Sequence, residues 1–130
     1  MTKHLAILGS WAIEEIFSGR KKIEGRFSKI KIDPFGKVAR GDVVLMKIPG
    51  EKIVGQFIVD RVIYFDHPRS EEVELIKETY GRELAVPVGF WQEHEKVNFV
   101  TLMFIKSATK FIVAPVVKKK DLRPWVVLEQ

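Results

Sequence analysis

Residues 17–31, FSGRKKIEGRFSKIK, decide the fold prediction, because an expected helix ends there and an expected strand begins. Gly19 follows the last apolar residue of the helix, and glycine in this place commonly ends a helix in the left-handed conformation. Side chains alternate between the two faces of an extended segment, so Glu24 and Arg26 are expected on one face. Ile23 is then expected on the other face, in the core. The pattern predicts one carboxylate among cations at the start of a strand.

Positive charge gathers in and after this segment. Six cations lie within it: Arg20, Lys21, Lys22, Arg26, Lys29 and Lys31. Residues 19–40 hold eight cations and two anions, whereas residues 60–95 hold nine acids and four bases. With a net charge of +5 for the whole chain, this asymmetry fits a polyanionic partner. The alternative interpretation is an ordinary solvated, charged surface.

Apolar spacing and turn residues predict the elements. A helix is expected from Ser10, which could cap it, to Gly19, and a second from Ser70 to Gly81. Strand candidates are residues 5–8, 22–27, 43–48, 52–65, 98–105, 110–117 and 125–128. Gly55, inside one of these candidates, predicts a β-bulge or a sharp bend. Six or so short strands with two main helices indicate an α+β fold built on a small mixed barrel.

Length and composition narrow the class of protein. A chain of 130 residues with 46% apolar residues suits a single domain, 1–130, with a real core. No apolar run approaches a membrane span of roughly 18 residues. The N-terminal residues make a poor signal peptide, and no cysteine is present to form a disulfide. We therefore expect a soluble cytoplasmic protein without membrane association.

The charged segment also resembles a known family. The pattern G-x-K-x-x-E-x-R is matched by Gly19, Lys21, Glu24 and Arg26, after a short amphipathic helix. In these features the chain resembles the ASCH (ASC-1 homology) domain family of the PUA-like superfamily. Gly41-Asp42 before strand 43–48, and the glycine-containing stretch VGQFIVDRV at residues 54–62, agree with the resemblance.

The resemblance implies a PUA-like barrel of about six strands, with a cleft beside the first helix. Relatives in the superfamily bind RNA, so RNA, a nucleotide or a modified nucleoside is the expected partner. In that cleft Lys21 and Arg26 are expected to hold a phosphate or carbonyl oxygen. Glu24 is expected to accept from a base edge or to orient Lys21. The candidate ligand-binding residues are Trp11, Gly19, Arg20, Lys21, Lys22, Glu24 and Arg26, with Trp11 as a stacking surface for a base.

A catalytic alternative rests on Lys21 and Glu24. One bacterial branch of the family is similar at Gly19-Arg20-Lys21 and hydrolyses the acetyl amide of an acetylated cytidine. That branch is expected to use the lysine with a threonine three residues later, where this chain has Glu24. The hypothesis is then a small hydrolase of a modified nucleoside or of RNA, with Glu24 as a general base toward water. A third possibility is a protein-interaction module.

Three further features complete the prediction. A second basic patch, Lys118, Lys119, Lys120 and Arg123, is either an accessory set of phosphate contacts or a solvated turn. The histidines His4, His67 and His94 do not have metal-ligand spacing, so neither a metal nor another cofactor is expected. Trp125, in the apolar run WVVL, is expected in the core.

Overall fold

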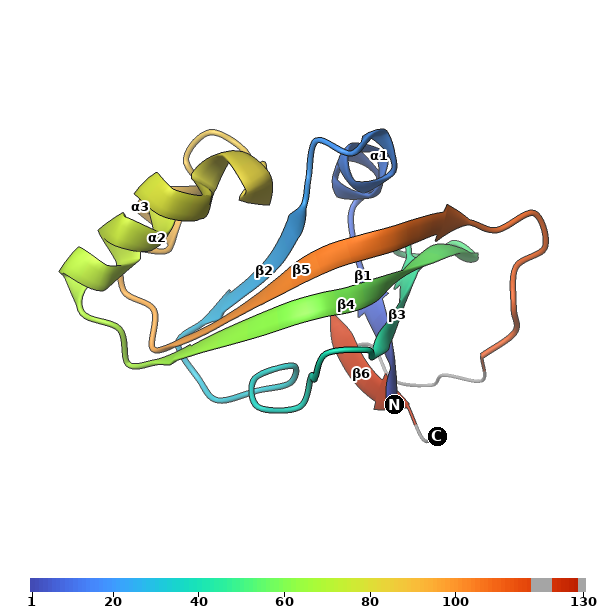
Figure 1. The fold of residues 1–130 in the computed structure, drawn as a ribbon, viewed down its shortest axis with the longest axis horizontal. Helices are drawn as coiled ribbons and strands as arrows, with labels where there is room; N and C mark the ends of the chain where they lie inside the picture. The colour runs from blue at the N-terminus through green and yellow to red at the C-terminus, as the bar shows by residue number, and fades with distance from the viewer. Residues whose placement is uncertain (118–122, 129–130) are drawn as a thin grey trace.

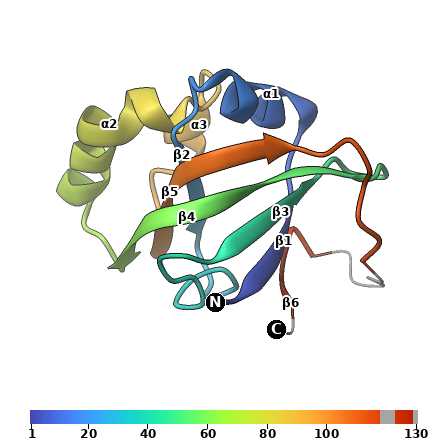
Figure 2. The same cartoon turned by 45° about the vertical axis from the view of Figure 1, so that its right-hand side comes forward.

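The computed structural model describes residues 1–117 and 123–128. Its strands are β1 (Lys3–Ile7), β2 (Ile23–Ser28), β3 (Val43–Lys47), β4 (Ile53–Asp66), β5 (Phe99–Lys110) and β6 (Trp125–Leu128). They form one sheet in the order β2-β5-β4-β3-β1-β6, in which β1 and β3 pair in parallel and the other neighbours are antiparallel. Three helices lie on one side of the curled sheet (Figures 1 and 2). The predicted α+β mixed barrel of about six strands is confirmed.

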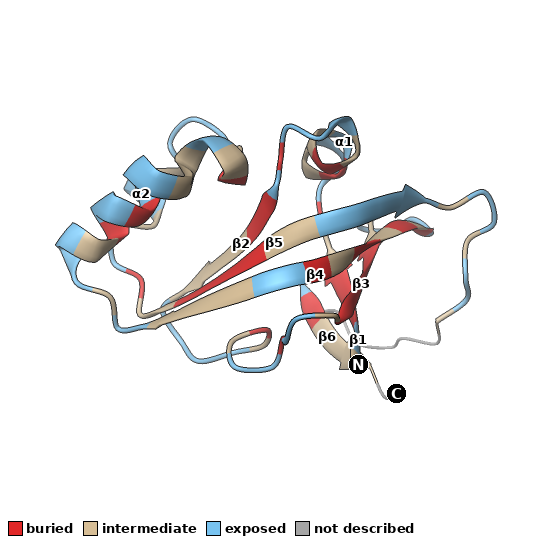
Figure 3. Ribbon diagram, in the orientation of Figure 1, coloured by how far each residue is buried: buried red, intermediate tan, exposed pale blue. Residues whose placement is uncertain are grey.

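The curvature of the sheet brings its two edge strands together. β2 and β6 stand at opposite ends of the strand order, yet the Arg26 guanidinium of β2 lies 5.1 Å from the ring centroid of Trp125 in β6. The same guanidinium donates to the Ile7 carbonyl at the end of β1. β2 and β6 are not paired through their backbones, so side chains make the contacts between them. We call this junction of the two edge strands the seam. Buried residues lie near the start of β2 and β5 and along most of β3, whereas the middle of β4 and the end of β5 are exposed (Figure 3).

Helix α1 (Ser10–Ser18) covers one end of the sheet and buries Ile13 and Ile16. Gly19 ends it with a φ of 84°, as predicted. The prediction that Ser10 caps the helix is wrong. Gly9 is the N-cap residue, because the chain is still extended there and is already helical at Ser10, and glycine has no side chain that could cap the helix.

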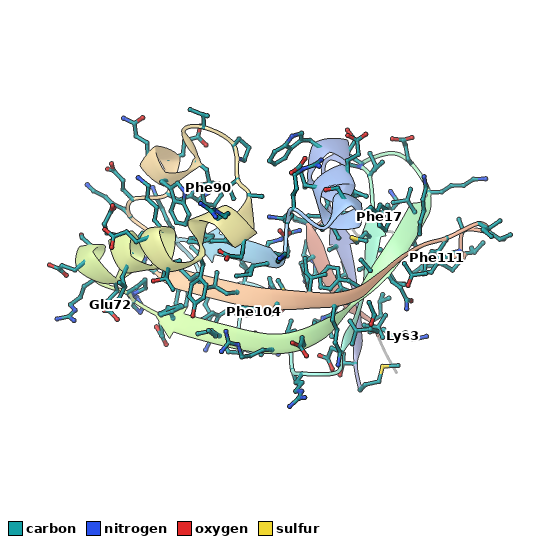
Figure 4. All side chains as sticks on the ribbon, turned by 45° about the horizontal axis from the view of Figure 1, so that its top comes forward. Lys3, Phe17, Glu72, Phe90, Phe104 and Phe111 are labelled. Carbon is teal, nitrogen blue, oxygen red and sulfur yellow. The ribbon has the colours of Figure 1, made fainter. Side chains whose placement is uncertain are left out.

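The bulge predicted at Gly55 is confirmed. Met46 pairs with Gly55 and Lys47 pairs with Ile53, so β4 carries one extra residue there. A Cβ atom at Gly55 would lie 2.5 Å from Cζ of Phe17 and 2.4 Å from the Thr109 carbonyl oxygen. Phe17, labelled on α1 in Figure 4, therefore packs on the sheet where only glycine leaves room.

Helix α2 (Ser70–Leu84) differs from the prediction at both ends. Arg69, not Ser70, is its N-cap residue, and the Arg69 N–H donates to the Glu72 carboxylate at 3.0 Å. The helix also continues past Gly81, because Leu84 is fully buried in the core cluster beneath it. The turn α3 (Phe90–Glu93) was not predicted.

The strand predicted at residues 110–117 is wrong, because β5 ends at Lys110. β5 pairs with β4, which begins at Ile53. The N–H of Phe111 donates the last backbone hydrogen bond between them, to the Val54 carbonyl. Beyond that point the sheet offers no neighbouring strand, so Ile112, Val113 and Val116 are exposed. Among the described residues, no helix is long and apolar enough to cross a membrane.

Candidate ligand-binding site

The motif residues form a buried chain of charges. The Lys21 ammonium donates to the Leu84 carbonyl at 2.5 Å and lies 3.4 Å from Oε1 of Glu24. Nε of Arg26 donates to Oε2 of the same carboxylate at 3.0 Å. The side chains of Lys21 and Glu24 are 4% and 5% exposed, whereas Arg26 reaches 20%. Glu24 therefore pairs with two cations, of which only Arg26 approaches the surface.

The local backbone explains why Lys21 turns inward. After Gly19 reverses the chain, the Lys21 N–H donates to the Glu15 carbonyl and the Lys22 N–H to the Glu83 carbonyl. The segment is thus held between the end of α1 and the end of α2. This position puts the Lys21 side chain beneath the last turn of α2, where the Leu84 carbonyl accepts from it.

The alternation of β2 follows the prediction. Glu24 and Arg26 share a face and bond to each other, and Ile23 is fully buried on the other face. Gly25 lies between them, and a Cβ atom there would be 2.7 Å from Cδ2 of Leu84. Glycine at this position therefore lets α2 pack directly on the strand that carries the motif.

Arg26 lies over Trp125, which is itself fixed from the other side. The Trp125 indole Nε1 donates to Nδ1 of His4 at 3.1 Å, and Nε2 of His4 lies 2.9 Å from Oδ2 of Asp42. An indole nitrogen can only donate, so Nδ1 must accept and Nε2 must carry the proton toward Asp42. This assigns a neutral His4 with one tautomer. The prediction that Trp125 lies in the core is confirmed.

Asp42 is the last member of the series of contacts that runs from Arg26 through Trp125 and His4. Burial alone would raise the pKa of its carboxyl group. Hydrogen bonds from His4 and from the backbone N–H groups of Thr2 and Ala39 outweigh burial, so the pKa of Asp42 is lowered. An ionised Asp42 holds His4, and through it the Trp125 ring, in a fixed orientation.

A pocket of about 500 Å³ opens at the seam beside Arg26. We call it the seam pocket. Its lining residues are Arg26, Phe27, Ser28, Lys31, Ile32, Asp33, Pro34, Phe35, Phe99, Thr101, Arg123, Pro124 and Trp125. Three of them are cations, one is a carboxylate, and Phe35, Phe99 and Trp125 are aromatic residues on the pocket side, whereas the Phe27 ring packs against Phe90 and Trp91 on the other face of β2. Its size is that of a small-molecule site.

The structure brings only part of the predicted site to the seam pocket. Arg26 and Arg123 line it, whereas Lys21 and Glu24 lie behind Arg26. The other candidates on and after α1 are not in its described lining: Trp11, Gly19, Arg20 and Lys22. Arg20 instead makes two hydrogen bonds to the Glu15 carboxylate. Lys118, Lys119 and Lys120 lie outside the described residues.

Several lining residues were not predicted from the sequence. Lys31 and Asp33 lie in or next to the charged segment, so their charge was visible although their place was not. Phe35 belongs to a predicted turn, and Phe99 and Thr101 come from β5. Only the pairing register of β2 with β5, which sets Thr101 opposite Arg26, could have identified Thr101.

A larger hollow of about 830 Å³ lies along residues 110–117 at the other end of the sheet. It is lined mainly by apolar side chains and by lysines, with Phe111 as its aromatic residue. We favour the seam pocket because Arg26 is held there by Glu24 and Ile7. Within residues 1–117 and 123–128, no group of three His, Cys, Asp or Glu side chains could hold a metal ion.

Solved structures share this arrangement of strands and helices. An ASCH protein from Zymomonas mobilis matches with a TM-score of 0.72 and 15% identity, over 98% of this chain and 88% of that chain. The chain has an ASCH-like fold. A serine-to-alanine mutant of the Zymomonas mobilis protein matches the ASCH-like domain with a TM-score of 0.72 and 15% identity, over 98% and 89% of the two chains. A tyrosine-to-phenylalanine mutant matches with a TM-score of 0.72 and 16% identity, over 100% and 92%.

No family model matches the sequence of the ASCH-like domain, and no curated protein matches it either. The resemblance first indicated by the G-x-K-x-x-E-x-R pattern is confirmed at the level of the fold. The roles of individual side chains rest on the geometry of this chain.

Proposed function

We propose that this ASCH-like domain binds single-stranded RNA or a nucleotide in the seam pocket. The observation that carries the proposal is Arg26, a guanidinium at the wall of an aromatic-lined pocket. Glu24 and Ile7 accept from Nε and Nη2, and no other hydrogen bond engages the guanidinium within the described part of the chain. Its remaining N–H donors are available to a phosphate or a base carbonyl.

The aromatic walls suit a nucleobase. Phe35 and Phe99 are half-buried and line the same pocket as Arg26. Phe35 and Phe99 contact each other edge to face with centroids 4.9 Å apart, so they hold each other in place. A base that stacks on such rings gains about 1–3 kcal/mol without a strict sequence requirement.

The charge around the pocket supports a nucleic-acid ligand. Lys29, Lys31, Lys37 and Arg40 are exposed on the segment between β2 and β3, part of which forms one wall. On the other side of the fold, α2 exposes acids such as Glu71, Glu74 and Glu78. A strand of RNA would therefore be drawn to the pocket side of the domain and repelled from α2.

The geometry favours binding over the hydrolase alternative. Lys21 and Glu24 are almost fully buried, and each already bonds to protein partners. A general base must reach the water from which it takes a proton. In this arrangement Glu24 accepts a hydrogen bond from Arg26 and pairs with Lys21. Its role is then to position the Arg26 guanidinium at the pocket, with Lys21 behind it.

Binding of a fluorescent single-stranded RNA oligomer tests the proposal. Arg26→Gln should weaken binding at least about tenfold, because a charge-assisted hydrogen bond contributes roughly 1.5–3 kcal/mol. Lys31→Gln, at the exposed rim, should weaken binding by about threefold without unfolding risk, the scale of a surface charge contact. Lys77→Gln on α2 removes the same charge far from the pocket and should bind within about twofold of wild type.

Thermal melting of each variant accompanies the binding assay. Variants at Arg26 and Lys31 that melt and bind RNA like wild type would contradict the proposal. If the wild-type protein binds RNA strongly and the Lys77→Gln variant does not, the RNA interface lies on α2 instead.

A further inference from the structure

The segment after β5 leaves large aliphatic side chains in solvent. Ile112, Val113 and Val116 are highly exposed, and all three line the open hollow of about 830 Å³ at that end of the sheet. A single exposed apolar residue is ordinary, but a group of them beside a hollow is typical of a contact surface. We call this hollow the lysine-rimmed hollow, after three residues of its lining: Lys47, Lys52 and Lys110.

The charge of the lysine-rimmed hollow indicates what kind of partner fits it. Its lining contains three lysines and no acid, and none of the three ammonium groups has an ion-pair or hydrogen-bond partner among the described residues. Glu51, next to Lys52 in the chain, is exposed and reduces the local excess to two positive charges. Two such hollows placed face to face would repel each other. The hollow therefore fits a surface that combines an apolar side chain with carboxylates.

Helix α2 of the same chain carries a surface of this kind. Leu75 is 60% exposed, and no carboxylate beside it on the helix has an ion-pair partner within the described part of the chain. Arg82 follows on the same side of the helix, so three carboxylates less one guanidinium leave a net charge of −2. We call this surface the acidic stripe, and its residues have the i, i+3, i+4, i+7 spacing of one helix face: Glu71, Glu74, Leu75 and Glu78.

We infer that the lysine-rimmed hollow binds the acidic stripe of a second copy of this chain. Helix α2 and the segment after β5 lie at opposite ends of the molecule, so the two surfaces of one copy cannot meet (Figures 1 and 2). In the contact, Leu75 packs on the aliphatic side chains of the hollow, and the carboxylates lie near the lysines. Exposed ion pairs contribute little affinity, so Leu75 is the anchor and the charges set the orientation.

Analytical ultracentrifugation of the RNA-free protein, from micromolar to millimolar concentration, tests this inference. The mean mass of the wild-type protein should rise with concentration. Leu75→Gln and Val113→Gln each remove the apolar contact from one surface and should weaken association at least about tenfold, the effect of one aliphatic side chain that is no longer buried. Val88→Gln changes a valine that is also exposed but lies outside both surfaces, and this variant should associate like wild type.

A mixture of the two weakened variants gives the sharpest measurement. The Leu75→Gln protein keeps an intact lysine-rimmed hollow, and the Val113→Gln protein keeps an intact acidic stripe. One complete contact can therefore form between them, so the equimolar mixture should associate at least about tenfold more tightly than either variant alone. A substitution that unfolded the protein, or that acted on a symmetric contact, would not be corrected by mixing.

The opposite results would overturn the inference. A wild-type protein that stays monomeric at every concentration would contradict it, and so would a mixture that associates no better than its components. If Val88→Gln also abolishes association, the contact is a non-specific apolar one. If Val113→Gln weakens binding of single-stranded RNA and leaves self-association unchanged, the hollow belongs to nucleic acid instead. RNA binding in the seam pocket is tested separately by the Arg26 and Lys31 variants, because neither surface belongs to that pocket.

Discussion

At the scale of single residues, Glu24 explains why one carboxylate stands among so many cations. It accepts from Arg26 and neutralises Lys21, and both partners are needed because the carboxylate is almost fully buried. That Glu24 shares a face with Arg26 could be read from the alternation of a strand. That Lys21 is buried could not, because its acceptor, the Leu84 carbonyl, lies 63 residues away in the chain.

Glu24→Gln should therefore destabilise the fold by about 3 kcal/mol, the usual result when one partner of a buried ion pair is removed. The amide leaves the Lys21 ammonium without a counter-charge and can no longer neutralise Arg26. Urea unfolding of the purified proteins measures the change. Glu15→Gln is the control, because its partner Arg20 is 67% exposed and the loss should be clearly smaller.

The same Glu24→Gln protein separates the positioning role from the catalytic one. With Glu24 as a positioning residue, the variant loses stability and RNA affinity together. Near-normal stability, combined with a loss of about 100-fold or more in hydrolysis of an acylated nucleoside, would instead favour Glu24 as a general base.

At the scale of elements, local sequence signals predicted the end of an element correctly where that end depends only on neighbouring residues. Gly19 ends α1 in the left-handed region, as glycine after the last apolar residue predicts. The same signal failed at Gly81, because α2 gains more by continuing until Leu84 packs against Gly25. Residues 110–117 were likewise predicted to form a strand, but β4 pairs with β5 only as far as Lys110, and the backbone bond from Phe111 to Val54 is the last one.

The two helix glycines predict opposite responses to alanine. Gly19→Ala should cost on the order of 1 kcal/mol, because a φ of 84° is strained for any residue with a Cβ atom. Gly81→Ala should stabilise the protein by roughly 0.5–1 kcal/mol, because it lies within α2 with nothing near the position of a Cβ atom. Paired thermal melts check both, and a stabilised Gly19 variant would refute the assigned end of α1.

At the scale of the whole molecule, the candidate site is a product of the curl of the sheet. Arg26 from one edge strand and Trp125 from the other meet at the seam, and β5 adds Thr101 beside them. The sequence indicated the fold class, the strand count and a basic segment. It could not indicate the pocket, since three strands distant in sequence contribute to it through their pairing register.

Positive and negative side chains also gather on different parts of the molecule. The segment between β2 and β3 carries exposed cations beside the seam pocket, and α2 carries acids elsewhere. An RNA strand that leaves the pocket would pass over this basic segment and release counterions from its phosphates. Binding should therefore depend on ionic strength far more than binding of an uncharged partner or of a protein surface.

The salt dependence of single-stranded RNA binding tests the central claim most directly. The logarithm of the association constant should fall linearly with the logarithm of salt concentration, with a slope near −0.7 for each phosphate contacted. Lys31→Gln should make that slope shallower by roughly one contact, and Lys77→Gln should leave it unchanged. A flat response in the wild-type protein, or no RNA binding at low salt, would contradict the claim that nucleic acid is the partner.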